Sequence, residues 1–318
     1  MIERVKVAVI GVGNNISALV QGIALYRATG SVVGIRTPVL DGVGVGDIDF
    51  VAAFAITPEK IGKDLTEAIF LPPNNFPRIT GELHPSGVIV ARGLIDAAEV
   101  ERVAAGLEGA EVVLYAAPSG RPETARAYAE AALRAGAAFI NATSDAVARD
   151  PQWLDRFTRA GLPLLGDDLA SQFGTSAVHH ALLRLLEERG LTLTSSYQVN
   201  LGGTEDFRNL VENSNTKLQS KLNALNAHEA TAGRVQVAPL GYLPHLSSRK
   251  VAHINIEAQA WAGTPVSLDL KLEVHDPSGA AGVTVDLIRM AASALRHGRA
   301  GYLSEAAPLL KSPPGTAV

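Results

Sequence analysis

The sequence predicts an α/β protein with a doubly wound parallel sheet, into which a second, largely antiparallel α+β sheet domain is inserted. An apolar run, Val5–Ile10, ends at Gly11-x-Gly13 and is followed by apolar residues at helical spacing, which indicates a strand, a tight turn and a helix. Further short apolar runs alternate with helical patterns, as in parallel sheets of the Rossmann type. In residues 251–260 and 267–275, apolar and polar side chains alternate, which indicates antiparallel strands with one buried face.

The change of period sets the expected domain boundaries. Residues 1–190 and 276–318 are expected to form the Rossmann-type, nucleotide-binding domain, and residues 191–275 the inserted sheet domain. Two domains are also expected from length, because 318 residues exceed the roughly 250–300 at which a single core stops growing. Helical spacing returns from Gly279, which predicts that the chain comes back to the first domain.

The other elements of the parallel sheet follow in order along the chain. Buried strands are expected at 49–56, 111–116, 137–140 and 162–165, and helices at 121–135, 151–160 and 171–189. Thr57 and Pro58 have the residue types of another helix start, with Thr57 as the N-cap. Residues 30–47 are rich in glycine and residues 71–84 in proline, so both segments are expected to be loops.

Composition excludes several classes of protein. The formal charge of −4, the pI near 6.1 and the absence of a basic stripe argue against a nucleic-acid partner, whose phosphates require clustered Lys and Arg. No apolar run reaches the roughly 18 residues that would span a membrane. Without cysteine, the chain can form no disulfide, no Cys-ligated zinc site and no thiol nucleophile. Met1–Lys6 leads directly into a strand, so no signal peptide is expected and cytoplasmic residence is the default.

The first turn indicates a dinucleotide site. Glycines at positions 11 and 13 allow backbone amides to approach a pyrophosphate, and the following helix N-terminus adds donors and a favourable dipole. The pattern is incomplete because Ile16 stands at the third glycine position. A short turn of this kind also occurs at purely structural strand–helix junctions.

The end of the second strand does not follow the usual NAD pattern. A carboxylate commonly binds the adenosine ribose there, whereas this strand ends in Phe54-Ala55-Ile56-Thr57. Thr57 could bind a ribose hydroxyl, or Arg36 could favour a 2′-phosphate. The choice between NAD and NADP is therefore open at this point.

Two acidic residues and two histidines near residue 170 are of residue types found in functional sites. Asp167-Asp168 follows an apolar strand, so the pair is expected on the ligand-bearing edge of the sheet, although one of them could instead cap the long helix that follows. His179 and His180 are adjacent and point in different directions, which suits structural roles better than a shared metal. No metal ligands are assigned.

Lysine use is selective. The chain contains 20 Arg and 8 Lys, so lysines that persist are candidates for tasks that require an amine of adjustable pKa. Lys217 and Lys221 lie four residues apart in a possible helix, where neighbouring ammonium groups would lower each other's pKa. Lys250 begins an alternating strand and Lys311 follows two leucines in a loop. The ordinary alternative is a set of solvated surface lysines.

Eight ordered segments resemble the myo-inositol-1-phosphate synthase family, in its shorter bacterial and archaeal form. They are GVGNNISALVQG at 11–22, FVAAF at 50–54, GDDLASQ at 166–172, NLGGTEDF at 200–207, TKLQSK at 216–221, SSRKVAHI at 247–254, DLKLEVHDP at 269–277 and LLKSPP at 309–314. The resemblance implies a Rossmann-type domain with an inserted sheet domain that makes homotetramer contacts. It also implies NAD as cofactor and conversion of glucose 6-phosphate to an inositol phosphate without net redox change.

The resemblance further implies which residues form the site. The family's four catalytic lysines correspond to Lys217, Lys221, Lys250 and Lys311, with Lys217 expected as the acid/base group. Residues expected to bind the cofactor are Gly11, Gly13, Asn14, Asn15, Thr57, Asp168, Ser171 and Asp276. Residues expected to bind the sugar phosphate are Gly203, Thr204, Asp206 and Ser248. Whether a cation is required stays open.

The sequence also departs from the family pattern. Ala55 and Thr57 stand where an acidic residue is usual, Ala170 replaces a polar residue, Thr204 replaces an Asn, and Ser248 occupies a position that often carries Asp. A divergent member that closes a five-membered ring from fructose 6-phosphate is therefore the first alternative. An NAD(P) dehydrogenase with net redox change and an inactive nucleotide-binding protein are the others.

Overall fold

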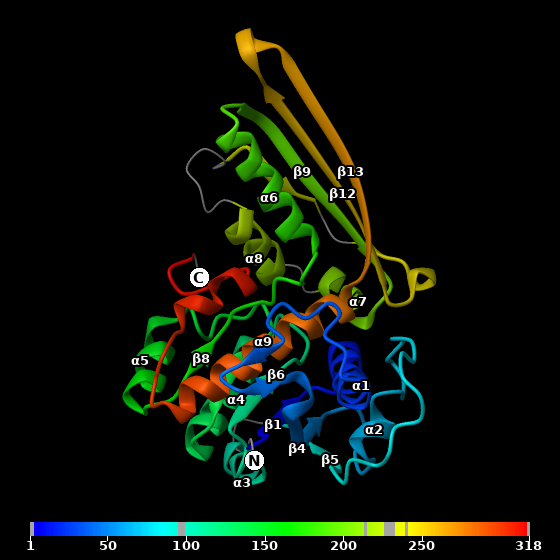
Figure 1. The fold of residues 1–318 in the computed structure, drawn as a ribbon, viewed down its shortest axis with the longest axis vertical. Coiled ribbons are helices and arrows are strands. Elements are labelled where there is room, and N and C mark those ends of the chain that lie inside the picture. Colours follow the sequence, from blue (N-terminus) through cyan, green and yellow to red (C-terminus); the bar gives the residue numbers. More distant parts are fainter. Residues whose placement is uncertain (1–2, 95–98, 213–214, 226–232, 239–240, 317–318) are drawn as a thin grey trace.

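The structure, a computed structural model, describes residues 3–94, 99–212, 215–225, 233–238 and 241–316. The lower half of Figure 1 contains a six-stranded parallel sheet with the strand order β5-β4-β1-β6-β7-β8. These strands are β1 (Val5–Ile10), β4 (Ile48–Ala55), β5 (Val90–Arg92), β6 (Val112–Tyr115), β7 (Ala138–Asn141) and β8 (Leu164–Leu165). This is the strand order of a Rossmann fold, so the predicted fold class is confirmed for this part of the chain.

Helices cover both faces of the parallel sheet. α1 (Asn14–Thr29) and α9 (Asp276–Arg296) pack on one face, and α3 (Val100–Gly106) and α4 (Pro122–Ala135) on the other. The alternation of side chains along β1 divides the core accordingly: its valines pack with α1 and α9, and Ala8 and Ile10 face the opposite layer. α5 (Pro151–Arg159) lies beside β8, and the short α2 (Leu65–Ala68) follows β4 in the chain.

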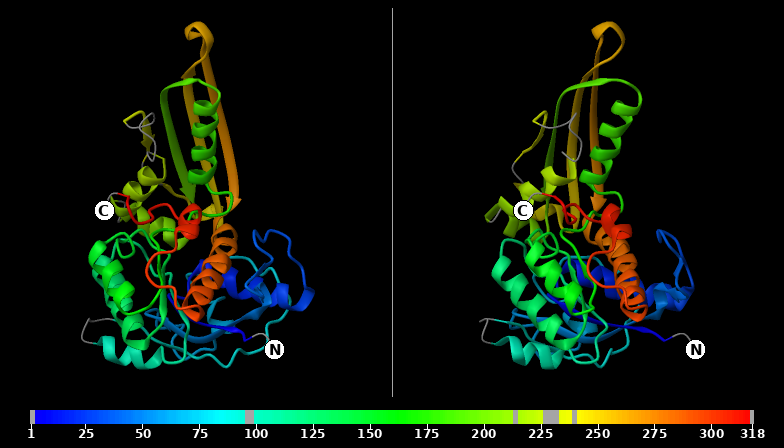
Figure 2. Two further views of the ribbon diagram at one scale, coloured as in Figure 1. Left: turned by 60° about the vertical axis from the view of Figure 1, so that its left-hand side comes forward. Right: turned by 90° about the vertical axis from the view of Figure 1, so that its left-hand side faces the viewer.

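A second sheet stands out from the Rossmann part, as all views in Figures 1 and 2 show. Its three long strands are β9 (Thr192–Gly202), β12 (Arg249–Gln259) and β13 (Pro265–His275), and β12 runs antiparallel to both neighbours. Two short strands, β10 (Val235–Val237) and β11 (Gly241–Tyr242), pair with β9 in parallel. The predicted inserted, largely antiparallel sheet is therefore confirmed.

Helices cover one face of this second sheet. α6 (Thr175–Glu188) packs on β9 and β12, and α8 (Asn215–Leu225) packs on α6 and β10. α7 (Glu205–Glu212) follows β9 directly. The buried side chains of β12 are those at alternate positions from Lys250 to Ala258, as its sequence pattern predicts.

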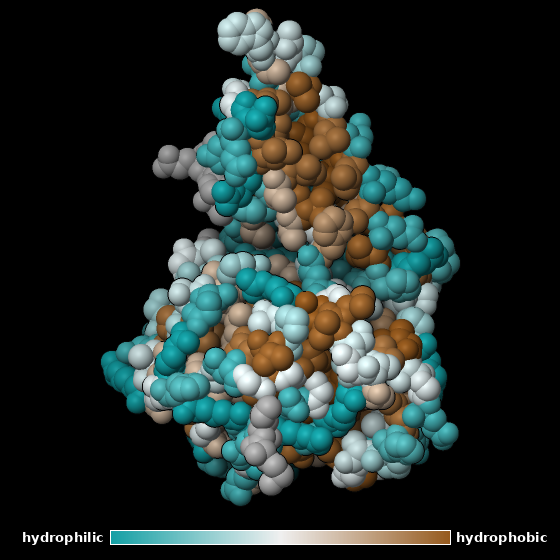
Figure 3. Space-filling model, in the orientation of Figure 1, coloured by the Kyte–Doolittle hydropathy of each residue, from teal (hydrophilic) through white to brown (hydrophobic). Residues whose placement is uncertain are grey.

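Strand β13 differs from its prediction. Its apolar residues were expected on a buried face, yet Val266 and Leu268 are each 37% exposed. They share a face with buried residues of β12, Ala258 and Ile256, but lie on the outer strand of the sheet. Figure 3 shows apolar side chains gathered on this projecting part of the molecule.

Several predicted boundaries are corrected. Residues 57–60 form turns rather than a helix start, and the first helix after β4 begins at Leu65, where the Asp64 side chain accepts the N-cap hydrogen bond from Thr66. α6 begins at Thr175 rather than near 171. Residues 71–84 form the predicted loop, whereas 30–47 contain a small hairpin of β2 (Val39–Leu40) and β3 (Val43–Gly44). Short 3₁₀ helices cover Val45–Asp47, Pro244–Leu246, Trp261–Gly263 and Ser304–Leu309.

The chain returns from the second sheet through α9, which begins one residue after β13 ends and runs back across the Rossmann part (Figure 1). The carboxyl end of β8 faces the inserted part of the chain, because Asp168 just after it pairs with Lys217 of α8. In the described part of the chain, no helix has the length and apolar character needed to cross a membrane.

Candidate active site

The first turn of the parallel sheet has the shape that a dinucleotide requires. Gly11 has a φ of 88°, and its amide donates to the carbonyl of Phe54. A Cβ at this position would lie 2.7 Å from the carbonyl oxygen of Ala116, so only glycine fits. Gly13 is the N-cap of α1, makes no side-chain capping hydrogen bond, and borders open space. The helix N-terminus is therefore available to a phosphate group, with Asn14 and Asn15 in its first turn.

The end of β4 offers a partly open surface beside this turn. Ile56 is 53% exposed and Thr57 is half-buried. No carboxylate lies between Ala55 and Thr57, as the sequence indicates. The residues present fit a dinucleotide whose pyrophosphate is held by backbone amides and whose ribose contacts a hydroxyl.

A buried lysine supports this turn, and the sequence analysis did not single it out. Lys60 is 2% exposed, and its Nζ donates to the carbonyl of Val12 at 2.6 Å and to Oδ1 of Asn74 at 2.8 Å. Burial lowers the pKa of Lys60 to about 8. It is one of only 8 lysines in the chain, which was the available signal.

The second half of the site is centred on Asp168. Its Oδ1 accepts hydrogen bonds from Nζ of Lys217 and Nζ of Lys311, each at 2.9 Å, and its Oδ2 accepts one from Oγ of Ser220 at 2.7 Å. Asp168 itself is 1% exposed. One carboxylate thus joins lysines that are 94 residues apart in sequence (311 − 217).

Backbone pairing explains how Lys311 reaches Asp168. The amide of Lys311 donates to the carbonyl of Asp168, and Asp167 and Ser312 exchange two backbone hydrogen bonds. This short pairing lays the segment after Leu310 along the segment after β8. On α8, Ser220 and Lys221 lie three and four residues after Lys217, so each is a neighbour of Lys217 on the helix surface.

Lys250 comes from the second sheet. Its Nζ donates to Oδ1 of Asp276 at 2.9 Å, and Asp276 is the first residue of α9, where a helix N-terminus favours a carboxylate. Next to them, Oγ of Ser248 lies 2.9 Å from Nδ1 of His275. Ser248 therefore supports the junction of β13 and α9 rather than facing away from it.

The electrostatics of the lysines differ strongly. Burial alone would raise the pKa of Asp168, but the ammonium groups of Lys217 and Lys311 hold it well below its usual value. Burial lowers the pKa of Lys217, yet the carboxylates of Asp168 and Asp206 outweigh burial and raise it. Burial, together with the other lysines, lowers the pKa of Lys311 to about 8.

Lys221 is the exception in this group. It is 4% exposed, and its Nζ has no hydrogen-bond partner among the residues that the structure describes. Burial and the neighbouring ammonium groups of Lys250, Lys311 and Lys217 lower its pKa well below the usual value. This site therefore contains one amine with a strong tendency to be neutral.

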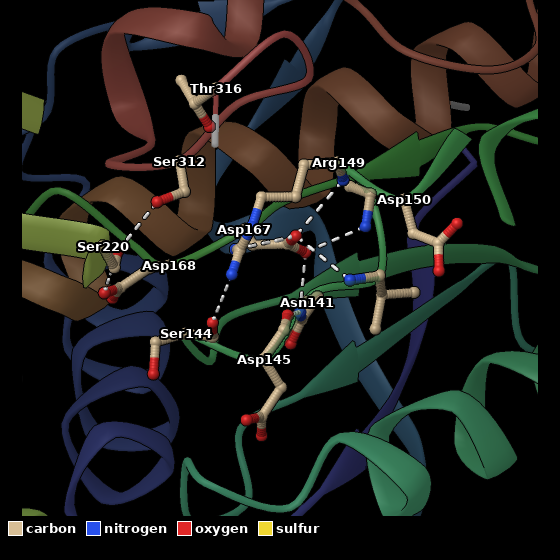
Figure 4. A network of polar contacts seen from close by, with 12 residues as sticks. Asn141, Ser144, Asp145, Arg149, Asp150, Asp167, Asp168, Ser220, Ser312 and Thr316 are labelled. Carbon is tan, nitrogen blue, oxygen red and sulfur yellow. Dashed lines mark hydrogen bonds and ion pairs between the residues drawn. The ribbon is translucent and has the colours of Figure 1, made fainter. Parts of the chain in front are cut away.

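A buried network of hydrogen bonds surrounds Asp167, the residue before Asp168 (Figure 4). Asp167 is fully buried and accepts hydrogen bonds from the amides of residues 147–149, from Asn141 and from Arg149. Asp168 points the other way, toward Ser220, which in turn contacts Ser312. Neither acid caps α6, whose N-cap is Gly174, so the capping alternative is wrong.

The remaining expected site residues lie in different places. Gly203 and buried Thr204 link β9 to α7, and Asp206 is exposed on α7 but close enough to Lys217 to influence its pKa. Ser171 lines a surface pocket of about 380 Å³ together with Arg36 and Asp286, and none of the four lysines lines this pocket. Both histidines have structural contacts, His179 with Ser196 and His180 with the carbonyl of Ala224. Within the described ranges, no group of three His, Asp or Glu side chains could hold a metal ion.

Comparisons with known proteins agree with this architecture. A family model described as myo-inositol-1-phosphate synthase matches residues 174–277. The chain is 38% identical to an inositol-3-phosphate synthase of Mycolicibacterium smegmatis, covering 98% of this chain and 93% of that protein. It is 36% identical to the enzyme of the same name from Corynebacterium glutamicum, covering 98% and 94%.

Solved structures give the same result. The crystal structure of a protein named Ari2 is 50% identical, has a TM-score of 0.87 and covers 99% of this chain and 94% of its own. A myo-inositol-1-phosphate synthase-related protein from Thermotoga maritima has a TM-score of 0.81 at 23% identity, covers 98% and 93% of the two chains, and shares the fold. Since relatives above one-third identity align along nearly its whole length, this chain belongs to the myo-inositol-1-phosphate synthase family.

Proposed function

We propose that the protein is an NAD-dependent cyclase that converts glucose 6-phosphate to myo-inositol 1-phosphate without net redox change. The observation that carries this proposal is the gathering of four lysines around Asp168 and Asp276 at the carboxyl edge of the parallel sheet. Such a cluster provides the positive charge that a phosphorylated, oxyanion-forming substrate requires. Relatives named inositol-3-phosphate synthase support the same assignment.

In this proposal the Rossmann part holds the cofactor, and residues 191–275 contribute three of the four lysines. The pyrophosphate would lie at Gly11, Gly13, Asn14 and Asn15, and Thr57 would contact the adenosine ribose. When bound, NAD supplies a reversible hydride acceptor for carbon five of the sugar. Asp168 and Asp276 orient the lysines toward the same place through their ion pairs.

The reaction balances over four changes at the substrate. Carbon five loses a hydride and its hydroxyl proton and becomes a ketone. Carbon six then loses a proton, and the resulting carbanion attacks the aldehyde at carbon one, whose oxygen takes up a proton. The hydride and a proton finally return to carbon five, so the sugar is isomerised and the cofactor is regenerated.

Lys221 is best suited to accept the hydroxyl proton that carbon five loses in this reaction. The sequence analysis expected Lys217 to do so, but the ion pair with Asp168 raises the pKa of Lys217 and holds it protonated. The lowered pKa of Lys221 favours the neutral amine, which is the form that can take up a proton. Lys217, Lys250 and Lys311 would then stabilise the negative oxygens and the phosphate as ammonium groups.

Two further features belong to the proposal. The outer strand β13, with its partly exposed apolar residues, would contribute to a homotetramer through the second sheet. Cytoplasmic residence suits an enzyme that requires NAD and a sugar phosphate.

The test is incubation of the protein with NAD and glucose 6-phosphate, followed by identification of the product by NMR. The expected product is an inositol phosphate, with no accumulation of NADH absorbance. No turnover of glucose 6-phosphate would overturn the proposal, and a parallel incubation with fructose 6-phosphate would reveal a five-membered cyclitol phosphate. Stoichiometric NADH would identify a dehydrogenase instead, and failure of the folded protein to bind NAD in calorimetry would identify an inactive nucleotide-binding protein.

A further inference from the structure

Asn75 lies between the cofactor half and the sugar-phosphate half of the site, and none of the roles given above includes it. Both the oxygen and the nitrogen of its side-chain amide form hydrogen bonds. Oδ1 accepts a hydrogen bond from Nδ2 of Asn14 at 2.9 Å, and Nδ2 donates one to the carbonyl of Gly203 at 2.9 Å. Asn14 belongs to the first turn of α1, and Gly203 directly follows β9. A single amide group therefore joins the Rossmann part to the second sheet.

The cofactor end of this link is well fixed. Oδ1 of Asn14 accepts hydrogen bonds from the backbone amides of Asn75 at 2.8 Å and Phe76 at 2.9 Å. The preceding residue, Asn74, donates to the carbonyl of Val12 in the glycine turn. Hydrogen bonds therefore connect the loop that carries Asn75 both to the glycine turn and to the first turn of α1.

The other end is equally constrained. A Cβ at Gly203 would lie 2.4 Å from the backbone nitrogen of Ser247, so these two backbone segments are in direct contact. Ser247 leads into β12, where Lys250 pairs with Gly202 in the sheet and with Asp276 through its ammonium group. Gly203 therefore contacts the segment that leads into the strand carrying Lys250.

We propose that Asn75 is a positioning residue that couples the two halves, so that the cofactor and the sugar phosphate each bind more tightly when the other is present. The identity of the two ligands rests on the proposed function. Coupling of this kind is reciprocal, because it is a free energy shared by both sites. Asparagine suits the role since one end must accept from Asn14 and the other must donate to Gly203.

The variant Asn75→Asp distinguishes the hydrogen bond accepted by Oδ1 of Asn75 from the one donated by its Nδ2. A carboxylate can still accept from Asn14, but it cannot donate to the Gly203 carbonyl and would face it oxygen to oxygen. Asn75→Ala removes both ends and serves as the second variant. The matched control is Gln21→Leu, because Gln21 holds the same loop to α1 through Ile79 and Pro77 and lies on the Rossmann side.

The experiment measures the dissociation constant of NADH by fluorescence with and without glucitol 6-phosphate, a polyol that has no carbonyl to reduce. In the wild-type protein, glucitol 6-phosphate is expected to tighten NADH binding by about fivefold or more. In Asn75→Asp and Asn75→Ala this ratio is expected to fall toward one, while Gln21→Leu keeps it. Thermal unfolding of each variant shows that the comparison is made on folded protein.

The outcomes separate the two proposals. If the wild-type protein binds NADH and glucitol 6-phosphate but shows no coupling, or if both Asn75 variants keep the wild-type ratio, the role of Asn75 is refuted and the proposed function is untouched. Equal loss in Gln21→Leu would also refute it, because loop anchoring would then explain the effect. If the wild-type protein does not bind glucitol 6-phosphate at all, the proposed function fails and this inference fails with it.

Discussion

The two lysines of α8 lie one helical turn apart but in opposite surroundings. Lys217 is ion-paired with Asp168, and the carboxylates around it raise its pKa. Lys221 is buried without a hydrogen-bond partner in the described part of the chain, and burial and the other ammonium groups lower its pKa. The Lys217 ammonium is therefore compensated by a carboxylate in the free protein, whereas the Lys221 amine has no such partner and tends to be neutral.

This difference separates two tasks. A paired ammonium is a fixed charge that positions and stabilises, because its proton is held. A buried amine without a partner has a lowered pKa and can take up a proton, and a nearby anionic ligand raises that pKa. A phosphorylated sugar would bring negative charge to this region, and its negative oxygens would lie close to the amine that accepts the proton.

The largest effect is expected from Lys221→Met. Loss of the proton acceptor should lower kcat for glucose 6-phosphate by about 10²- to 10⁴-fold, the usual contribution of a general base. Stability should hold or increase, because the substitution removes a buried amine without a partner. Kinetics and thermal unfolding check this, with exposed Lys63→Met as the control. A kcat within tenfold of wild type would show that Lys221 is not the base.

Asp168→Asn tests the ion-paired lysines, because it removes the carboxylate that compensates the charges of Lys217 and Lys311. Two ammonium groups whose side chains are only 13% and 12% exposed lose their carboxylate, which should cost about 3–5 kcal/mol of unfolding free energy. Denaturant unfolding measures this. Asp49→Asn, which breaks exposed ion pairs with Arg4 and Arg27, should cost no more than about 1 kcal/mol. Equal losses in the two variants would mean that burial of the Asp168 cluster is unimportant for stability.

A smaller, pH-dependent effect is expected from Lys311. With its pKa lowered to about 8, Lys311 is charged below that pH and loses its charge above it. Binding of glucitol 6-phosphate should therefore weaken as pH rises above about 8, by at most about tenfold per pH unit. Calorimetry from neutral to alkaline pH checks this, and Lys311→Arg should flatten the dependence because guanidinium stays protonated. A flat wild-type profile would remove Lys311 from phosphate binding.

The sequence predicted much of this arrangement because the governing patterns are local. A glycine turn after an apolar strand, helical spacing on α8 and alternation along β12 each depend on neighbouring residues. The side chains that orient the cluster were not predicted. Ser220, Arg149 and Asn141 reach Asp167 or Asp168 only after strands and helices from distant segments have packed.

The wrong details have the same cause. Thr57 and Pro58 have the residue types of a helix start, but the chain turns there, and buried Lys60 donates to Val12 and Asn74. The exposure of β13 follows from its position as the outer strand of the sheet, which its own alternation cannot indicate. Tertiary position decides both cases, so only the structure could show them.

The smallest effect is expected from Lys60→Met, which tests whether the buried lysine beside the glycine turn contributes to cofactor binding. Lys60 holds the Val12 carbonyl from the side of the buried core, and burial is the cause of its low pKa. A bound pyrophosphate would favour its protonated form, so the variant should weaken NADH binding about tenfold, or about 1.4 kcal/mol. Fluorescence titration without sugar phosphate isolates this effect from Lys311, and Lys63→Met is again the control. If NADH affinity is unchanged while stability falls, Lys60 supports the glycine turn only and takes no part in cofactor binding.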